Sequence, residues 1–254
     1  MIRLNNLIIL LFVIILLTNG TAVFCGDLLI FGNNDKSPKY YLENKKPKGI
    51  LIDIMRYAEA ETGYSFDIIL YPWKRAYHNA LQEKGGIIGL SKNSERLRIF
   101  DYSDVMYYDD LVLVVLKGNE FPFDKIEDLK GKTLGVQRGS SYGEEFEKGK
   151  GVLFETVEDD NQVNRLRRLL RNRLDAALIG PGKIGFSHIV RQDSELLRRK
   201  DEFVILPKLF KRDPNFLGFL KTMEMRTFLE KFNRALEKGR KTGAVQKILD
   251  SYSN

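Results

Sequence analysis

Short apolar segments alternate with amphipathic helical segments along most of this chain, and this alternation limits the folds open to it. The segments 28–31, 66–71 and 87–90 have the length and composition of strands, whereas 50–62 and 73–82 place apolar residues at helical spacing. Repeated strand–helix units of this kind pack as a partly parallel sheet covered by helices. The sequence therefore predicts an α/β protein.

The alternation begins again after residue 110. The fully apolar segment 111–116 predicts a buried strand, and no Gly/Ser-rich linker separates it from what precedes. Later strands are expected at 133–136, 152–155, 175–179 and 203–206, and later helices from about 141, at 160–172, from 181 toward 191, at 223–240 and through 248–249. Two such series predict two lobes, each a mixed sheet flanked by helices.

The N-terminus has the features of a secretory signal peptide. The basic residue Arg3 precedes an unbroken apolar run at 7–17, and small polar residues follow it. A membrane span takes about 20 residues, so a retained anchor is the less favoured alternative. We expect a signal peptide at 1–25 and a periplasmic mature chain. Lipid attachment at Cys25 is a further alternative, disfavoured because the bulky Phe24 precedes the cysteine.

The composition excludes several kinds of chemistry. Cys25 is the only cysteine, and the two histidines, His78 and His188, are far apart, so we expect no disulfide, no metal site and no cofactor. No phosphate-binding loop, dinucleotide fingerprint or Gly-x-Ser-x-Gly elbow is present. The net charge of +7 favours anionic partners only weakly. No nucleic-acid motif accompanies it, and the basic run at 165–173 predicts a solvated helix face.

One segment carries more specific information. It reads Gly-Leu-Ser-Lys-Asn-Ser-Glu-Arg-Leu-Arg-Ile-Phe-Asp-Tyr-Ser-Asp from residue 89 to residue 104. A strand leaves the sheet at Gly89 and a short helix begins near Ser94, with Arg96 in its first turn. A cation gains nothing from the helix dipole there, so Arg96 suggests a bidentate grip on a carboxylate. A surface arginine paired with Asp101 or Asp104 is the alternative.

This segment resembles, without a gap, the signature of the family 3 solute-binding proteins, the polar amino-acid receptors of ABC importers. The family pattern runs Gly-x-Thr-x-Thr-x-x-Arg and, a few residues later, Asp-Phe-Ser-Asp. Three further segments are similar to family motifs in the same order: Gly-Ile-Leu-Ile-Asp at 49–53, the run from 128 to 141, and Arg-Leu-Asp-Ala-Ala-Leu at 173–178. The resemblance spans about residues 27–254.

The resemblance implies a two-lobed type II periplasmic-binding fold. Lobe one would comprise 26–107 and 207–254, lobe two would comprise 108–206, and the crossovers would lie near 106–110 and 203–207. The ligand carboxylate would be held by Gly89, Ser91 and Arg96. The aromatic Trp73 would pack on the ligand, with a core position as its alternative. Lobe two would contribute Gln137, Ser140 and Ser141, the last at a helix N-terminus, and the remaining aligned ligand positions are Asn33 and Gly180.

Several positions depart from the family pattern. Gly180 stands where the family places an aspartate that binds an ammonium group, and Asn33 occupies the first-lobe carboxylate position. Lys36 stands where an aromatic often lies, and Lys74 with Arg75 adds positive charge near the expected cleft. A buried ammonium is costly without a carboxylate partner. We therefore expect an amine-free carboxylate or a dianion to bind better than a standard α-amino acid, unless Asp35 replaces the missing acids.

The expected partners follow from the same resemblance. They are a small-molecule carboxylate ligand and an ABC importer permease or a membrane sensor, with no nucleic acid, and we expect a monomer. The competing hypothesis is an enzyme on the same fold, because the family resembles periplasmic dehydratases of cyclic dienyl acids. Such an enzyme needs a general acid or base, for which Glu95 and Asp35 are the best candidates. We favour binding, without catalytic residues.

Overall fold

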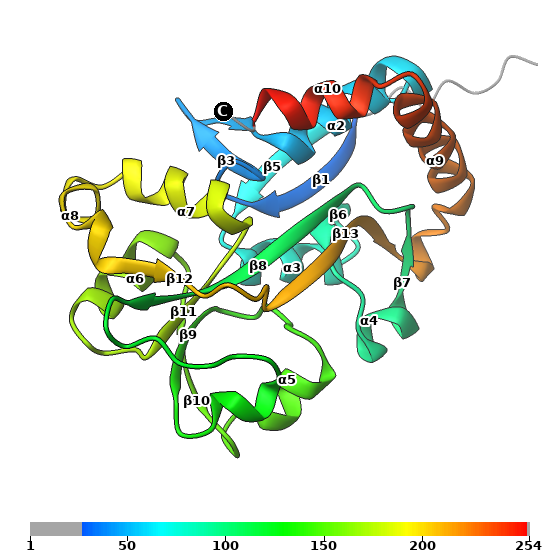
Figure 1. Ribbon diagram of the computed structural model, residues 1–254. Helices are drawn as coiled ribbons and strands as arrows, with labels where there is room; N and C mark the ends of the chain where they lie inside the picture. The colour runs from blue at the N-terminus through cyan, green and yellow to red at the C-terminus, as the bar shows by residue number, and fades with distance from the viewer. Residues whose placement is uncertain (1–26, 253–254) are drawn as a thin grey trace, which may run out of the picture.

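The computed structural model of the protein describes residues 27–252, and the expected signal peptide with Cys25 lies outside this range. Figure 1 shows two lobes, one containing the start and the end of the described chain and the other its middle. In lobe one, β1 (Leu28–Asn33) lies between β5 (Phe66–Tyr71) and β6 (Gly86–Leu90), all parallel. The predicted α/β class is confirmed.

Helices cover both faces of the lobe-one sheet. Ile30 packs with α2 (Ile50–Thr62) on one face, and its neighbour Phe31 packs with α3 (Trp73–Leu81) on the other. This division follows from the alternation of side chains along a strand. The C-terminal helices complete the α2 face. They are α9 (Arg226–Lys241) and α10 (Ala244–Ser251), preceded by the 3₁₀ turn η3 (Lys221–Met223).

Two short segments of lobe one lie next to the space between the lobes. A small antiparallel sheet follows β1 and consists of β2 (Asp35–Lys36), β3 (Tyr40–Glu43) and β4 (Lys46–Lys48). The helix α4 (Ser94–Ile99) follows β6 and leads into β7 (Phe100–Tyr102). Both segments therefore extend from the carboxyl ends of parallel strands, where ligands bind in open α/β sheets.

Lobe two repeats the parallel arrangement around β9 (Thr133–Gln137), which lies between β10 (Glu155–Asp159) and β11 (Ala176–Ile179). Its helical elements are η1 (Ile126–Leu129), α5 (Glu144–Gly149), α6 (Gln162–Leu170), α7 (Gly182–Arg191), α8 (Ser194–Arg198) and η2 (Lys200–Glu202). The short strand β12 (Phe203–Ile205) pairs antiparallel with the long strand β8 (Tyr107–Leu116). The middle of the chain thus forms a second mixed α/β unit.

Two long antiparallel strands connect the lobes. They are β8 (Tyr107–Leu116) and β13 (Lys211–Leu220), paired from Tyr107 opposite Asn215 to Leu111 opposite Lys211. β8 also pairs with β11 of lobe two, and β13 also pairs with β6 of lobe one, both antiparallel. The sheet order therefore runs β10-β9-β11-β8-β13-β6-β1-β5. The expected second crossover at 203–207 is wrong, because β12 pairs within lobe two and the chain returns along β13.

The apolar cores divide at these connecting strands. The two clusters of lobe one draw on residues up to Tyr107 and again from Leu217 onward, whereas the two clusters of lobe two draw on residues 111–210. The cores themselves therefore separate the chain into two packed units. We retain 107/108 as a proposed lobe boundary and move the second proposed boundary from 206/207 to β13, because Phe210 still packs in a lobe-two core.

Some local expectations need correction. The strand expected at 152–155 begins at Glu155, since Gly151 with φ +72 turns the chain and leaves Val152 exposed. The helix expected from about Ser141 begins only at Glu144, after the extended Gly143. Ser141 is therefore in a loop and not at a helix N-terminus. Among residues 27–252, no helix is both long and apolar enough to span a membrane.

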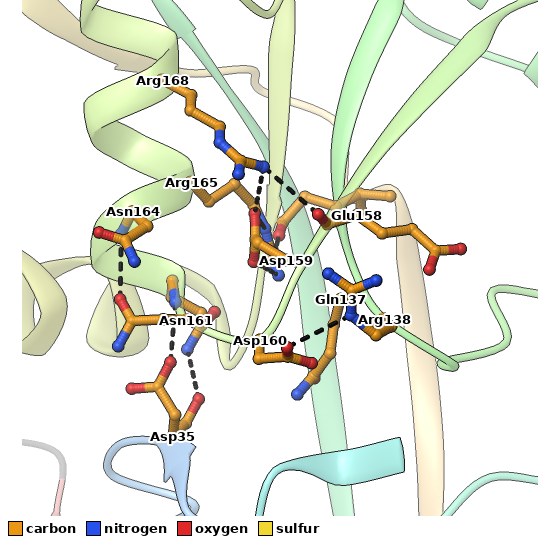
Figure 2. A network of polar contacts seen from close by, with 12 residues as sticks. Asp35, Gln137, Arg138, Glu158, Asp159, Asp160, Asn161, Asn164, Arg165 and Arg168 are labelled. Atoms are coloured by element: carbon orange, nitrogen blue, oxygen red, sulfur yellow. Dashed lines mark hydrogen bonds and ion pairs between the residues drawn. The ribbon is translucent and has the colours of Figure 1, made fainter.

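The basic run at 165–173 is also only partly a solvated face. Arg165 is 1% exposed, and its guanidinium binds both carboxylate oxygens of Asp159 at 2.7 and 3.2 Å. Figure 2 shows Arg168 reaching toward the same acid from the next turn of α6. The first arginine of the run thus fixes α6 to the end of β10. The Asn161 side chain caps the helix by accepting from the backbone amide of Asn164.

Candidate functional site

A pocket lies between the lobes. Both lobes and both connecting strands contribute to its wall, which is polar and charged apart from a few aromatic and aliphatic side chains. The lining residues are Lys36, Lys39, Tyr40, Trp73, Gly89, Ser91, Arg96, Asp109, Leu111, Gln137, Ser140, Ser141, Tyr142 and Asp213. Polar groups that converge on one pocket from two lobes suit a small polar solute.

Arg96 is a buried cation that lobe one contributes to this pocket. It is 4% exposed, and its Nη1 donates to the carbonyl oxygen of Ser91 at 3.2 Å and to Ser91 Oγ at 3.1 Å. The Asn93 side chain caps α4 by accepting from the Arg96 amide, which fixes the start of the helix. Among the described residues Arg96 has no acidic partner, and Asp101 pairs with Arg226 instead.

Aromatic rings hold the guanidinium in place. Arg96 Cζ lies 4.9 Å from the ring centroid of Tyr77 and 5.9 Å from that of Trp73, and these two rings stack on each other. Both aromatics come from α3, so helical spacing places them on one face. Trp73 is 5% exposed, packs in the core and also lines the pocket. Trp73 is thus a core residue that also reaches the pocket, and its packing on a ligand stays a prediction.

Gly89 leaves room for a third aromatic side chain, that of Tyr40, in the same wall of the pocket. Its φ of +74° favours glycine, and an added Cβ would lie 2.6 Å from both Cε1 and the hydroxyl of Tyr40. Tyr40 is 2% exposed, and burial raises the pKa of its hydroxyl above the ordinary value. The phenol therefore remains protonated at neutral pH and can donate a hydrogen bond into the pocket.

The wall contributed by lobe two lies around the end of β9. Gln137, Ser140 and Ser141 all line the pocket, as expected from the sequence. The backbone amide of Gln137 donates to the hydroxyl of Tyr142 at 2.9 Å. Trp73 Nε1 donates across the cleft to the carbonyl oxygen of Gly139 at 3.1 Å. The Trp73 indole therefore touches lobe two directly, beside the pocket.

The sequence did not indicate the buried ion cluster at the back of the pocket. Asp109, which is 1% exposed, accepts hydrogen bonds on Oδ2 from Lys39 at 2.8 Å and from Lys36 at 3.3 Å. Burial tends to raise the pKa of Asp109, but the two ammonium groups lower it to about 2. An acid at the edge of the apolar run 111–116 was the available signal. Its partners could not be found, because they lie about seventy residues away in sequence.

A second acid was missed for a similar reason. Asp213 is 8% exposed and pairs with Lys211 at 2.6 Å. It lies on β13, which the sequence did not predict, since Pro214 and four charged or polar residues interrupt the apolar pattern. Leu111, Tyr142 and Tyr40 also line the pocket without having been predicted.

Two predicted ligand positions do not line the pocket. Asn33 is fully buried, and its Oδ1 accepts from the Asp35 amide at 2.9 Å, so it shapes the turn after β1. Gly180 lies behind Asp109, and a Cβ there would come within 2.6 Å of Asp109 Oδ1. The carboxylate that the family pattern places at position 180 is thus supplied from the neighbouring strand β8.

Several contacts join the lobes around the pocket. Asp35 Oδ2 accepts from the amide of Gln162 at 2.7 Å, where α6 begins, and Figure 2 shows Asp35 facing that helix end. Ser37 Oγ lies 3.2 Å from His188 Nδ1, and Ser94 donates to Glu144. The structure is therefore the closed arrangement. Asp35 faces the helix end, does not line the pocket and does not contact the ammonium groups there.

Within residues 27–252, no group of His, Cys, Asp and Glu side chains could hold a metal ion. The pocket carries the Arg96 guanidinium, which has no acidic partner within the described part of the chain, and a lysine–aspartate–lysine cluster. Such a wall can bind and orient an anion through charge-assisted hydrogen bonds.

Two α/β lobes that meet around a polar pocket and are joined by two antiparallel strands define a protein that binds a solute between its lobes. The chain belongs to the bacterial extracellular solute-binding proteins, family 3, which match residues 29–254. The family resemblance and the type II fold predicted from the sequence are confirmed.

Individual relatives are distant. The arginine-binding extracellular protein ArtP of Bacillus subtilis is 26% identical over 227 residues, covering 87% of this chain and 84% of that protein. The L-cystine-binding protein TcyJ of Escherichia coli K12 is 26% identical over 161 residues, covering 63% and 56%. Both are similar to this chain and carry names of amino-acid-binding proteins.

Solved structures show the same fold. An ancestral arginine-binding protein bound to arginine is 25% identical, with a TM-score of 0.75 and coverage of 90% of this chain and 99% of that one. A histidine kinase sensor domain similar to periplasmic binding proteins is 19% identical, with a TM-score of 0.75 and coverage of 90% and 96%. The fold thus occurs both in binding proteins and in a sensor.

Proposed function

We propose that this protein captures a small carboxylate-bearing solute outside the cytoplasm by closing its two lobes on it. Arg96, Ser91 and Gly89 hold the carboxylate, and Trp73 packs beside it. From lobe two, Gln137, Ser140 and Ser141 add polar contacts. These residues line one pocket, which supports their assignment to one ligand.

The charge state of Arg96 carries this proposal. A guanidinium stays protonated at any ordinary pH, and this one is buried with only neutral oxygen partners among the described residues. A buried charge without a counter-ion is costly, and the fork of N–H donors fits a carboxylate in a bidentate manner. A ligand carboxylate would supply the missing negative charge at low desolvation cost to the protein.

The physiological partner is an ABC importer permease or a membrane sensor, and the protein acts as a monomer. Membership of an extracellular solute-binding family supports a location outside the cytoplasm. The names of the curated relatives favour transport, whereas the fold shared with a histidine kinase sensor domain supports sensing equally well.

Binding without catalysis is part of the same proposal. The enzyme hypothesis relied on Glu95 and Asp35, but Glu95 is exposed and neither residue lines the pocket. Asp109 is charged at neutral pH and held by two lysines, so it has no proton to donate. Incubation with candidate cyclic acids, followed by mass spectrometry for converted product, tests this part of the proposal.

Substitution of Arg96 tests the carboxylate assignment. The ligand for this test is the organic acid that raises the melting temperature of the wild-type protein most in a panel of small acids. Arg96→Ala is expected to weaken its binding by about 2–5 kcal/mol, because one partner of a buried charge pair is removed. Isothermal calorimetry measures the change. Arg98→Ala is the matched control, since Arg98 is exposed on the same helix. Unchanged affinity in Arg96→Ala would overturn the assignment.

A further inference from the structure

The lysine–aspartate–lysine cluster defines a second charged region of the pocket, formed by other elements than the helix that carries Arg96. Lys36 and Lys39 come from the β2–β3 segment of lobe one, whereas Asp109 comes from the connecting strand β8. The side chains of Lys39 and Asp109 are 3% and 1% exposed, and that of Lys36 is 11% exposed. These three charged groups are therefore built into the site and are not mobile surface residues.

Asp109 does not recreate an ammonium site, although it lies where the family pattern would place an acid. Its Oδ2 already accepts from two ammonium groups, which give the cluster a net positive charge. An incoming ligand ammonium at Asp109 would lie close to both lysines and would be repelled by them. Both lysines are too deeply buried to move into water without opening the site.

The charge balance of the whole pocket points in the same direction. Lys36, Lys39 and Arg96 face the pocket as cations, against the two acids Asp109 and Asp213. Asp213 is paired with Lys211, and its Oδ2 also accepts from the Asn215 side chain. Each acid is thus paired with at least one lysine, whereas positive charge remains in excess at Arg96 and at the two lysines.

We propose that the solute carries two anionic groups, one that binds Arg96 and one that binds Lys36 and Lys39. This inference rests on the proposed function. An ammonium group has three N–H donors, and each lysine uses one of them on Asp109. The remaining donors can bind an anion without breaking the contacts to Asp109. The ligand class is then an amine-free dicarboxylate or a similar dianion of small size.

One oxygen in the cluster has no donor. Asp109 Oδ1 is buried without a hydrogen-bond partner within the described part of the chain, and it lies against Gly180. A ligand hydroxyl could donate to it without adding positive charge. A ligand ammonium is the competing donor, and the experiment below includes it.

Matched acids separate these cases by calorimetry. Succinate and glutarate are compared with propanoate and butanoate, which lack the second carboxylate, and with aspartate and glutamate, which add an α-ammonium group. At least one dicarboxylate is expected to bind about tenfold or more tightly than both of its counterparts. Tighter binding of the amino acid, with loss of that preference in Asp109→Asn, would overturn the proposal.

Variants assign the second subsite. Lys36→Met and Lys39→Met are each expected to weaken dicarboxylate binding on the order of thirtyfold and monocarboxylate binding by much less, so that the preference for the dicarboxylate is lost. Retained monocarboxylate binding also shows that each variant is folded. Lys46→Met is the control, because Lys46 is exposed on β4 of the same small sheet. Equal binding of dicarboxylate by the wild type and both pocket variants would contradict the assignment.

The two proposals fail in different ways. If monocarboxylates and dicarboxylates bind equally and both depend on Arg96, the carboxylate grip stands and only the second anionic subsite is wrong. If no carboxylate binds, or if binding does not depend on Arg96, the proposed function fails and the inference fails with it. Should both lysine variants fail to fold, the comparison of the six acids on the wild-type protein still decides the ligand class.

Discussion

At the scale of single residues, the most unusual group is the carboxylate of Asp109. Burial opposes its charge, and the two lysine ammonium groups favour it more strongly, so its pKa falls from the ordinary 3.8 to about 2. A carboxyl group whose pKa is lower in the folded protein stabilises the fold above its unfolded pKa. That stabilisation is lost as the pH falls through the folded pKa.

The expected result is a pH-dependent difference between the wild type and Asp109→Asn. Near neutral pH the wild type should gain stability on the order of 2 kcal/mol from the lowered pKa of Asp109. This gain should disappear between about pH 4 and pH 2. Urea unfolding of both proteins across this range measures it. A difference in unfolding free energy that is constant with pH would contradict the charge assignment.

The sequence allowed Arg96 to be predicted and Asp109 to be missed, for physical reasons. Arg96 lies within one continuous segment, where the turn at Gly89, the cap at Asn93 and the short helix are all local. Asp109 gains its role from Lys36 and Lys39, which reach it through tertiary packing. Local patterns do not contain such contacts, and Gly180 shows only that an acid is absent from one strand.

At the scale of elements, hydrogen bonds between Asp35 and Gln162 join the start of α6 to the other lobe. Asp35 Oδ2 accepts from the free Gln162 amide at 2.7 Å, and the Gln162 side chain donates to the Asp35 carbonyl oxygen at 3.3 Å. Helix N-termini carry unsatisfied amides and a partial positive charge, so a carboxylate stabilises them. The contact exists only when the lobes are together.

Asp35→Ala is therefore expected to favour the open form. Loss of a cap-like hydrogen bond costs about 0.5–2 kcal/mol, and this cost should appear as weaker ligand binding, because binding and closure are coupled. Calorimetry with the tightest-binding acid measures it. Asp67→Ala provides the control, since Asp67 is exposed on β5. Equal affinities for the Asp35 variant and the wild type would show that the contact does not stabilise closure.

Elements with a clear period were predictable, and those set by long-range pairing were not. The strand β5 and the helix α2 with its left-handed cap Gly63 lie where the sequence indicates, because apolar periodicity and glycine determine them locally. β13 was missed because its first half pairs with β8 between the lobes, where the buried residues Asp213 and Asn215 are polar and no apolar run forms. The order of strands likewise depends on pairing across the chain.

At the scale of the whole molecule, two cores joined by two strands favour movement of one lobe against the other. The connecting strands β8 and β13 can absorb a change in backbone angles at their ends, which permits hinge closure. Closure brings the Trp73 indole of lobe one to Gly139 and encloses the pocket. In the proposed function, the solute contacts from both lobes would form together, so that binding and closure would be one event.

Small-angle scattering of the wild type and Arg96→Ala, each with and without a saturating amount of the tightest-binding acid, tests capture by closure most directly. The wild type should show a smaller radius of gyration with the acid than without it, because the ligand carboxylate on Arg96 favours the closed form. Arg96→Ala should show the same radius in both conditions at that concentration. Identical curves for the wild type with and without the bound acid would contradict closure, and compaction of Arg96→Ala equal to that of the wild type would contradict the role of Arg96.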